Sequence, residues 1–307
     1  MALLSIVAAK ARHREPVFTA EISPPRLYLE IDRIVGIARR LRALGLDAIA
    51  VTNSTGGSYK FSPWAIVEDI QRAMGRVPLI IHLTARDEGS ARSVYYHLHE
   101  MSLKGVRDVL IIRGDPSPGN SKLLDSYRFT TSDLVRLASG YRRGMLLDGS
   151  RCEPLPNLDI FVAAHPEYPE GALDKHFRFL RRKIEAGADA MIANIVTDTD
   201  AFFRYRDRAR TAGIDRPIVP SLLPLNSARR CAFLTEQLHI PVPQAIIERL
   251  RAATREDAQQ LGLDDLLAKL QRLIAGGAPG ANFNIIVPSD AEVIVEGLRA
   301  LRSSPRT

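Results

Sequence analysis

The sequence predicts an α/β fold, a (β/α)8 TIM barrel, on three observations. Short aliphatic runs, typical of strands buried on both faces, alternate with helical patterns along nearly the whole chain. Helical stretches close on a glycine that a strand soon follows, as in Ala186-Gly187-Ala188-Asp189 before Ala190–Ile195. Eight strands are found, the number that closes such a barrel. No Gly-x-Gly-x-x-Gly pattern follows any strand, which weakens the alternative, an open doubly wound sheet.

The predicted strands are short runs rich in Val, Ile, Leu and Ala, bounded by turn-forming or charged residues. In chain order they are Val17–Ile22, Ala48–Thr52, Leu79–Leu83, Val109–Ile112, Asp159–Ala164, Ala190–Ile195, Ile218–Ser221 and Asn282–Val287. The fourth ends in Arg113-Gly114-Asp115, and Pro116 forbids further regular structure there.

The predicted helices lie between these strands, where apolar residues recur at helical spacing. They are Glu30–Leu44, Pro63–Met74, Gly89–Leu103, Ser132–Ser139, Leu173–Ala186, Asp200–Ala212 and Ser227–Leu238. A long helical region, Gln244–Ile274, and a final helix near Ala291–Leu301 complete the series.

The composition favours one large domain. The chain has 307 residues, of which 46% are hydrophobic, enough for a large core. No linker or charge block divides it, so residues 1–307 are expected to form a single barrel domain with a short N-terminal extension, residues 1–15. Met1–Ala9 is mildly apolar, but basic residues follow it, unlike a secretory signal.

Charge and cysteine usage restrict the expected partners. The formal charge is +7, but the basic residues cluster within helical patterns, which favours solvated helix faces over a nucleic-acid site. No apolar run approaches the roughly 20 residues that cross a bilayer. Cys152 and Cys231 have no metal-type spacing. We therefore expect a reduced, cytoplasmic protein without a nucleic-acid or membrane partner.

The barrel prediction also locates a candidate site, because barrel enzymes place their chemistry at the carboxyl ends of the strands. The polar residues there are Glu21, Thr52, Asn53, His82, Thr84, Arg113, Asp115, His165, Glu167 and Asn194. Gly114 would let a ligand approach the backbone. Metal ligands are too few to favour a metal site. Taken singly, Glu21 could be a surface glutamate, His82 a core histidine, and Arg113-Gly114-Asp115 a charged turn.

Several of these residues lie in motifs that resemble the methylenetetrahydrofolate reductase family. The motifs are Phe18-Thr19-Ala20-Glu21-Ile22-Ser23-Pro24-Pro25-Arg26, Pro78-Leu79-Ile80-Ile81-His82-Leu83-Thr84, Arg113-Gly114-Asp115, Ala163-Ala164-His165-Pro166-Glu167, Lys183-Ile184-Glu185-Ala186-Gly187-Ala188-Asp189 and Pro220-Ser221-Leu222-Leu223-Pro224. Each motif is weak alone, but they occur in the family's order over nearly the whole chain.

The resemblance implies flavin-dependent, reversible reduction of 5,10-methylenetetrahydrofolate to 5-methyltetrahydrofolate. Glu21 would be the general acid, with Asp115 as a second catalytic residue. The flavin would contact Thr52, Asn53, His82, Arg113, Gly114, Asp115, His165, Arg182 and Lys183, and the folate would contact Glu21, Asp115 and Asn194. The methylene bridge accepts hydride only after N10 is protonated and the ring opens. A carboxyl whose pKa is raised by burial suits that step.

The resemblance implies FAD as cofactor and NADH or NADPH as electron donor, in a homo-oligomer of one-carbon metabolism and methionine biosynthesis. FMN, or no flavin, is also open, because His176 and Phe179 stand where polar flavin contacts are usual. The segment from Arg143 to Asn157 resembles an insert of the acetogen-type and methyltransferase-fused branch. Members of that branch can use other donors.

Three alternatives stay open. The first is a flavin-independent reductase of the same substrate. The second is a non-catalytic folate-binding accessory subunit of a one-carbon pathway. The third, an aldolase or lyase that uses Lys183 as a Schiff base, is weakened because Lys183 falls in a helical pattern and not at a strand end.

Overall fold

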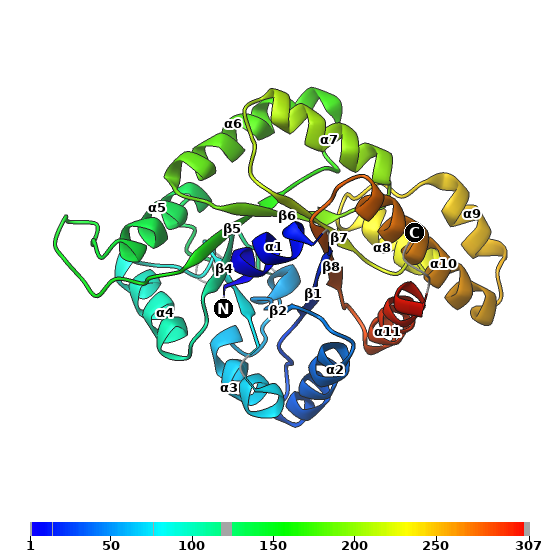
Figure 1. The fold of residues 1–307 in the computed structure, drawn as a ribbon, viewed down its shortest axis with the longest axis horizontal. Helices are drawn as coiled ribbons and strands as arrows, with labels where there is room; N and C mark the ends of the chain where they lie inside the picture. The colour runs from blue at the N-terminus through cyan, green and yellow to red at the C-terminus, as the bar shows by residue number, and fades with distance from the viewer. Residues whose placement is uncertain (1, 14, 76, 118–124, 304–307) are drawn as a thin grey trace.

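The computed structural model describes residues 2–13, 15–75, 77–117 and 125–303. Eight parallel strands pair in chain order, and β8 returns to pair with β1, so the sheet closes into a barrel (Figure 1). The strands are β1 (Val17–Ile22), β2 (Ala48–Val51), β3 (Leu79–Thr84), β4 (Asp108–Ile112), β5 (Asp159–Ala164), β6 (Ala190–Ile195), β7 (Ile218–Leu222) and β8 (Gly280–Asn284). The predicted (β/α)8 fold is confirmed.

The described helices surround this barrel, apart from α1, which lies across one of its ends (Figure 1). They are α1 (Leu3–Arg12), α2 (Ile31–Ala43), α3 (Pro63–Met74), α4 (Ala91–Leu103), α5 (Thr131–Arg142), α6 (Glu170–Ala186), α7 (Thr199–Thr211), α8 (Ala228–Glu236), α9 (Gln244–Ala252), α10 (Arg255–Ala275) and α11 (Pro288–Ser303), with two 3-10 turns at Tyr28–Glu30 and Thr55–Gly57. Among the described helices, none is both long and apolar enough to cross a membrane.

Local side-chain bonds set the element ends that the sequence pattern misplaced. The predicted helical region Gln244–Ile274 divides into α9 and α10, because the Thr254 hydroxyl accepts from the Asp257 amide and starts a new helix. The predicted last strand ends early, at Asn284. The amides of Ile286 and Val287 bond instead to the Asp290 carboxylate, at 3.0 and 2.9 Å.

Within the predicted N-terminal extension, helix α1 covers the amino-terminal end of the barrel (Figure 1). The Leu3 amide donates to Asp108 at 2.8 Å, and the Leu4 amide donates to Asp159 at 2.9 Å. Both aspartates begin their strands, so the carboxylates cap the helix and fix it to β4 and β5. The Leu3 side chain packs on the inward residues Val17, Ala48, Ala50, Ile80, Leu110, Phe161, Ala190 and Ile192.

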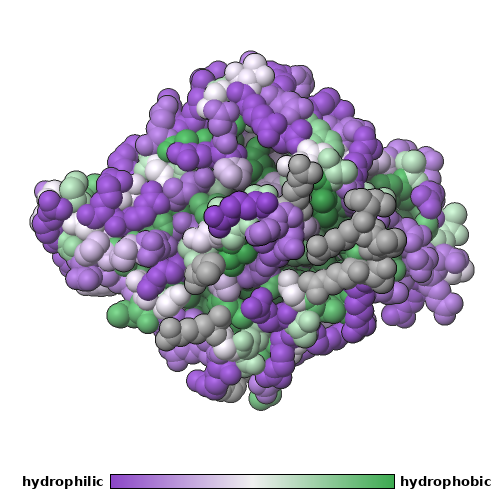
Figure 2. Space-filling model, in the orientation of Figure 1, coloured by the Kyte–Doolittle hydropathy of each residue, from purple (hydrophilic) through white to green (hydrophobic). Residues whose placement is uncertain are grey.

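The alternation of each strand divides its side chains between two environments. Phe18, Ala20 and Ile22 face outward into the main core between strands and helices. Thr19 and Glu21 face the barrel interior, as their partners on β8 show. On the end that α1 covers, the outer surface is mostly hydrophilic (Figure 2). The opposite end, where the strands finish, is the mouth of the barrel.

Candidate functional site

Glu21 is the central carboxyl of the mouth. It is an inward-facing residue near the end of β1, beside Ala50 of β2 and Asn284 of β8. Its side chain is only 20% exposed. Burial raises the pKa of Glu21 to about 7, although hydrogen bonds with Asn284 and Asn282 and the charge of Lys60 act to lower it. A carboxyl with this pKa can both give and take a proton near neutral pH.

A chain of buried polar side chains lies beneath Glu21. The Thr19 hydroxyl donates to Asn282 Oδ1 at 2.8 Å, and Asn282 Nδ2 donates to Ser221 Oγ at 3.0 Å. These bonds fix the side-chain amide of Asn282, which lowers the pKa of Glu21 by hydrogen bonding. Sequence reasoning missed Asn282 and Asn284 as site residues. The available signal was their alternation around Phe283, which places both amides on one face of a strand.

His82 faces the same carboxyl from β3. Its Nε2 lies 3.8 Å from Glu21 Oε2, which is beyond hydrogen-bond length. Burial lowers the pKa of His82 to about 3, so the imidazole is neutral at physiological pH. This Nε2 is buried and has no hydrogen-bond partner among the described residues. His82 therefore offers a neutral polar atom beside the acid and no positive charge.

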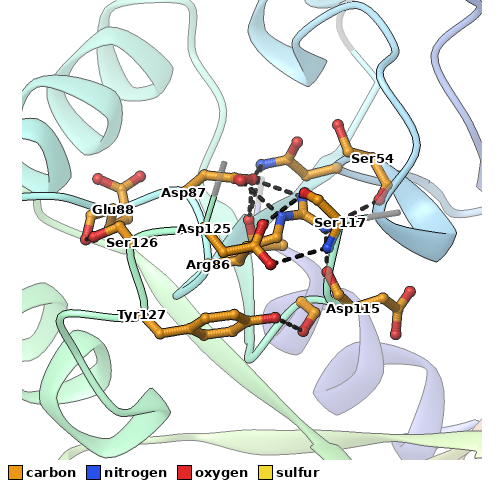
Figure 3. Close-up of polar contacts among 12 residues, drawn as sticks. Ser54, Arg86, Asp87, Glu88, Asp115, Ser117, Asp125, Ser126 and Tyr127 are labelled. Atoms are coloured by element: carbon orange, nitrogen blue, oxygen red, sulfur yellow. Dashed lines mark hydrogen bonds and ion pairs between the residues drawn. The ribbon is translucent and has the colours of Figure 1, made fainter. Parts of the chain in front are cut away.

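The Arg86 side chain joins the ends of β2, β3 and β4 (Figure 3). It is 2% exposed, donates to the carbonyl oxygens of Ser54 at 3.2 Å and Asp115 at 2.8 Å, and forms an ion pair with Asp87. Sequence reasoning missed Arg86 also. An arginine two residues past a strand resembles an ordinary charged turn, and only its burial distinguishes it.

Asp115 is at the mouth, as predicted, but its carboxylate already has a partner. Its Oδ2 accepts from the Gly56 amide at 2.7 Å. A Cβ on Gly57 would lie 2.0 Å from the Pro116 carbonyl oxygen, so only glycine permits this contact. The loop after β2 is thus closed against the loop after β4.

The remaining predicted residues of β2 lie in the same network. Thr52 is buried and shares a 2.8 Å hydrogen bond with Ser23. Asn53 donates to Thr84 at 3.2 Å and to Asp87 at 3.1 Å. Both side chains therefore line the mouth close to Asp115.

His165 and Asn194 meet at a buried carboxylate on the β5 and β6 side of the mouth. Both contact Glu167 Oε1 at 2.8 Å. Burial by itself would raise the pKa of Glu167, but the hydrogen bond and charge of His165 and the bond from Asn194 outweigh it and lower the pKa. The His165 ring stacks on Tyr168, with centroids 5.0 Å apart. His165 and Asn194 are thus oriented by Glu167.

The structure separates the predicted cationic residues. Arg113 is exposed at the mouth, 5.0 Å above the Tyr127 ring, and Gly114 beside it has φ +83°. Arg182 and Lys183 instead lie in the last turns of α6, about 20 Å along the helix from its start beside the mouth. Burial lowers the pKa of Lys183 to about 8. Arg182 and Lys183 therefore lie along α6, apart from the other predicted cofactor residues, and their expected role near the flavin phosphates stays a prediction.

The mouth residues fit the ring of a flavin better than its phosphates. Thr52, Asn53, His165 and the unpartnered His82 nitrogen supply hydrogen-bonding groups around a flat ring. Arg113 is the predicted cation that remains at the mouth for a phosphate. His176, expected near a flavin-contact position, bonds instead to the Tyr205 hydroxyl at 2.7 Å within the core.

Comparisons with known proteins agree with this arrangement. The model of the family described as methylenetetrahydrofolate reductase matches residues 6–295. A rice protein named probable methylenetetrahydrofolate reductase (NADH) is 27% identical over 81% of this chain and 42% of its own length. The 5,10-methylenetetrahydrofolate reductase of Escherichia coli K12 is 26% identical over 73% of this chain and 69% of its own. The chain thus spans less than half of the rice relative.

Among solved structures, an uncharacterized Clostridium thermocellum protein that binds two copies of 5-methyl-5,6,7,8-tetrahydrofolic acid is similar, with a TM-score of 0.66. It is 16% identical and covers 97% of this chain and 99% of its own, a likeness that shows the barrel fold. The family match extends over nearly the whole sequence and includes every motif on which the resemblance was based. The chain belongs to the methylenetetrahydrofolate reductase family.

Proposed function

We propose that this protein reduces the methylene group of 5,10-methylenetetrahydrofolate to a methyl group, with a reduced nicotinamide as the electron source. The observation that carries the proposal is Glu21, a carboxyl with a pKa of about 7 at the mouth of a barrel. Relatives named as NADH or NADPH reductases of this substrate support the donor.

Glu21 would act as the general acid. It gives its proton to N10 of the folate as the bond from N10 to the methylene carbon breaks, which leaves an N5 iminium. Hydride then adds to the methylene carbon and forms the N5 methyl group. One hydride and one proton are consumed and NAD(P)⁺ is released, so atoms and electrons balance. The same residues serve the reverse direction.

The other mouth residues would bind and orient the folate. The carboxylate oxygen of Asp115 that does not bond to Gly56 can accept from the amino group and N3 of the pterin. Asn194, fixed by Glu167, can bond to the opposite edge of the ring. Because burial lowers the pKa of His82 to about 3, its imidazole stays neutral and does not take the proton of Glu21.

A flavin, FAD or FMN, would relay the hydride when bound. Thr52, Asn53, His82, Gly114 and His165 are the residues that would hold its ring, and Arg113 would hold a phosphate. This route follows the family resemblance, and the unpartnered nitrogen of His82 supports it.

A second candidate is direct transfer from nicotinamide to folate without a flavin. The closure of the β2 loop on the β4 loop, through Gly56, Gly57 and Arg86, favours it because protein groups already use the Arg-Gly-Asp strand end. The position of Arg182 and Lys183, away from the mouth, favours it also.

The visible spectrum of the purified protein separates the two routes. A bound flavin gives a visible absorbance band that bleaches when NADH is added under anaerobic conditions. Colourless protein that binds no added flavin and still reduces the substrate supports direct transfer. If the protein reduces the substrate neither with flavin nor without it, the proposed reaction is contradicted.

The acid role is tested by Glu21→Gln. We expect folate reduction to fall by about 100-fold or more, the usual contribution of a general acid, while ligand binding persists. Glu185→Gln on exposed α6 surface is the matched control and should keep full activity. Turnover by Glu21→Gln at the wild-type rate would assign the proton to another group.

A further inference from the structure

We propose that Arg26 and Lys60 form an anion-binding pair that holds the negatively charged tail of a ligand whose ring lies over Glu21. The inference rests on the proposed function and extends it, because it assigns a site to the part of the ligand that does not react. The tail carries carboxylate or phosphate groups.

The backbone holds the two cations side by side. Arg26 follows Pro25 in the loop after β1, and Lys60 precedes Phe61 in the loop after β2. The Phe61 amide donates to the Pro25 carbonyl oxygen at 3.0 Å, so this single bond brings residues 26 and 60 together. The pairing joins two different strand ends.

Hydroxyl groups connect Lys60 to the mouth. Its Nζ donates to Thr55 Oγ1 at 2.8 Å, and that hydroxyl lies 3.3 Å from Ser23 Oγ. Ser23 in turn shares a 2.8 Å bond with Thr52, a mouth residue. Lys60 is therefore on the Glu21 side of the loop, within reach of a ligand that leaves the mouth there.

The charges of the pair are not neutralised within the described part of the chain. Neither Arg26 nor Lys60 has an ion-pair partner among the described residues. Burial and the charge of Arg26 lower the pKa of Lys60, while Glu21 acts to raise it. Two cations held together repel each other, and an anion between them would remove that cost.

The surroundings suit a ligand that combines an aromatic part with an anion. Leu27 is 63% exposed and Tyr59 is 71% exposed, and each adjoins one of the two cations in sequence. These two side chains could contact the apolar part of a ligand whose anion lies between the cations. Two ligands of the proposed reaction have this chemistry: the glutamyl tail of the folate and the diphosphate of the dinucleotide.

Binding measurements with complete and truncated ligands test the pair. 5-Methyltetrahydrofolate is compared with 5-methyltetrahydropteroamide, in which a neutral amide replaces the glutamyl group, and NADH with dihydronicotinamide riboside, which lacks phosphate. We expect Lys60→Met and Arg26→Met each to lower the affinity for one complete ligand on the order of 10-fold, because each variant loses one charge-assisted hydrogen bond. The truncated ligand should bind unchanged, and Lys60→Arg should restore most of the affinity.

The pattern of losses identifies the source of the anion. A loss confined to the folate pair assigns the glutamyl carboxylates, and a loss confined to the NADH pair assigns the diphosphate. Lys175→Met, an exposed lysine on α6, is the control for a general change in charge. Equal weakening of complete and truncated ligands, or no weakening of either complete ligand, overturns the inference.

A second readout separates this inference from the proposed function. Because the charge of Lys60 lowers the pKa of Glu21, Lys60→Met should move the pH midpoint of activity upward, which a purely structural role would not do. Failure of the wild-type protein to reduce the folate would refute the proposed function alone. The binding comparison needs no turnover and would still decide the role of the pair.

Discussion

Glu21 is subject to two opposing influences at the end of β1. Burial favours its neutral form, while the amides of Asn282 and Asn284 and the charge of Lys60 favour its ionised form. The balance leaves the pKa at about 7, and full burial without these partners would raise it further. If the neutral carboxyl is the reactive species, kcat/KM should be highest at low pH and fall as the pH rises through about 7.

Asn284→Leu tests whether the amide sets this midpoint. The variant removes a hydrogen bond that lowers the pKa of Glu21, so the falling limb of the profile should move to higher pH, with the carboxyl protonated over a wider range. The measurement is kcat/KM from pH 5.5 to about 9 for both proteins. An unchanged midpoint would mean that burial alone determines the pKa.

At the scale of elements, the Arg86 side chain holds together three loops that have no regular structure of their own. It satisfies two backbone carbonyl groups and one carboxylate while being 2% exposed. The loop after β2 and the loop after β4 therefore keep their relative positions through one residue of β3's loop. This arrangement also orients the Asp115 carboxylate, because that carboxylate accepts a hydrogen bond from Gly56, which belongs to the loop that Arg86 holds.

Arg86→Met should therefore loosen both loops together. We expect a loss on the order of 2 kcal/mol in the free energy of unfolding, because two carbonyl groups lose their donor and partly exposed Asp87 loses its ion pair. Hydrogen exchange at the Gly56 amide should quicken, as should exchange at Ser117. Arg92→Met, at an exposed position of α4, is the control. Faster exchange at Gly56 alone would contradict a shared support.

The sequence pattern was most informative where periodicity carries the structure. β1, β5 and β6 have the predicted bounds, as does α3, because their aliphatic runs and helical spacing are determined by burial. Single side-chain bonds decided the rest. The hydrogen bonds of Asp290 end β8, and the burial of Arg86 lets its side chain hold the loops of the mouth together. Neither feature changes the local pattern of apolar and polar residues in the sequence. Residues contributed by strand ends could be predicted, whereas the partners that orient them could not.

At the scale of the whole molecule, the two ends of the barrel differ in packing and in exposure. One end is filled by α1, whose Leu3 is 1% exposed against the inward residues of six strands. The other end keeps Glu21 partly exposed. Leu3 and Glu21 are separated by the length of a strand, roughly 18 Å for six residues. A parallel barrel can therefore gain stability at one end and leave polar, incompletely paired groups at the other.

Leu3→Ala tests whether the ends are independent. A truncated buried leucine typically costs about 2–5 kcal/mol, so chemical denaturation should show a clear loss of stability. The affinity for 5-methyltetrahydrofolate should stay unchanged, because Leu3 packs with Leu110, Phe161 and other inward residues at the end of the barrel away from the mouth. Leu29→Ala, at a side chain 90% exposed, is the control for stability and should cost little. A parallel decrease in affinity and stability would show instead that packing at the amino-terminal end positions the mouth residues.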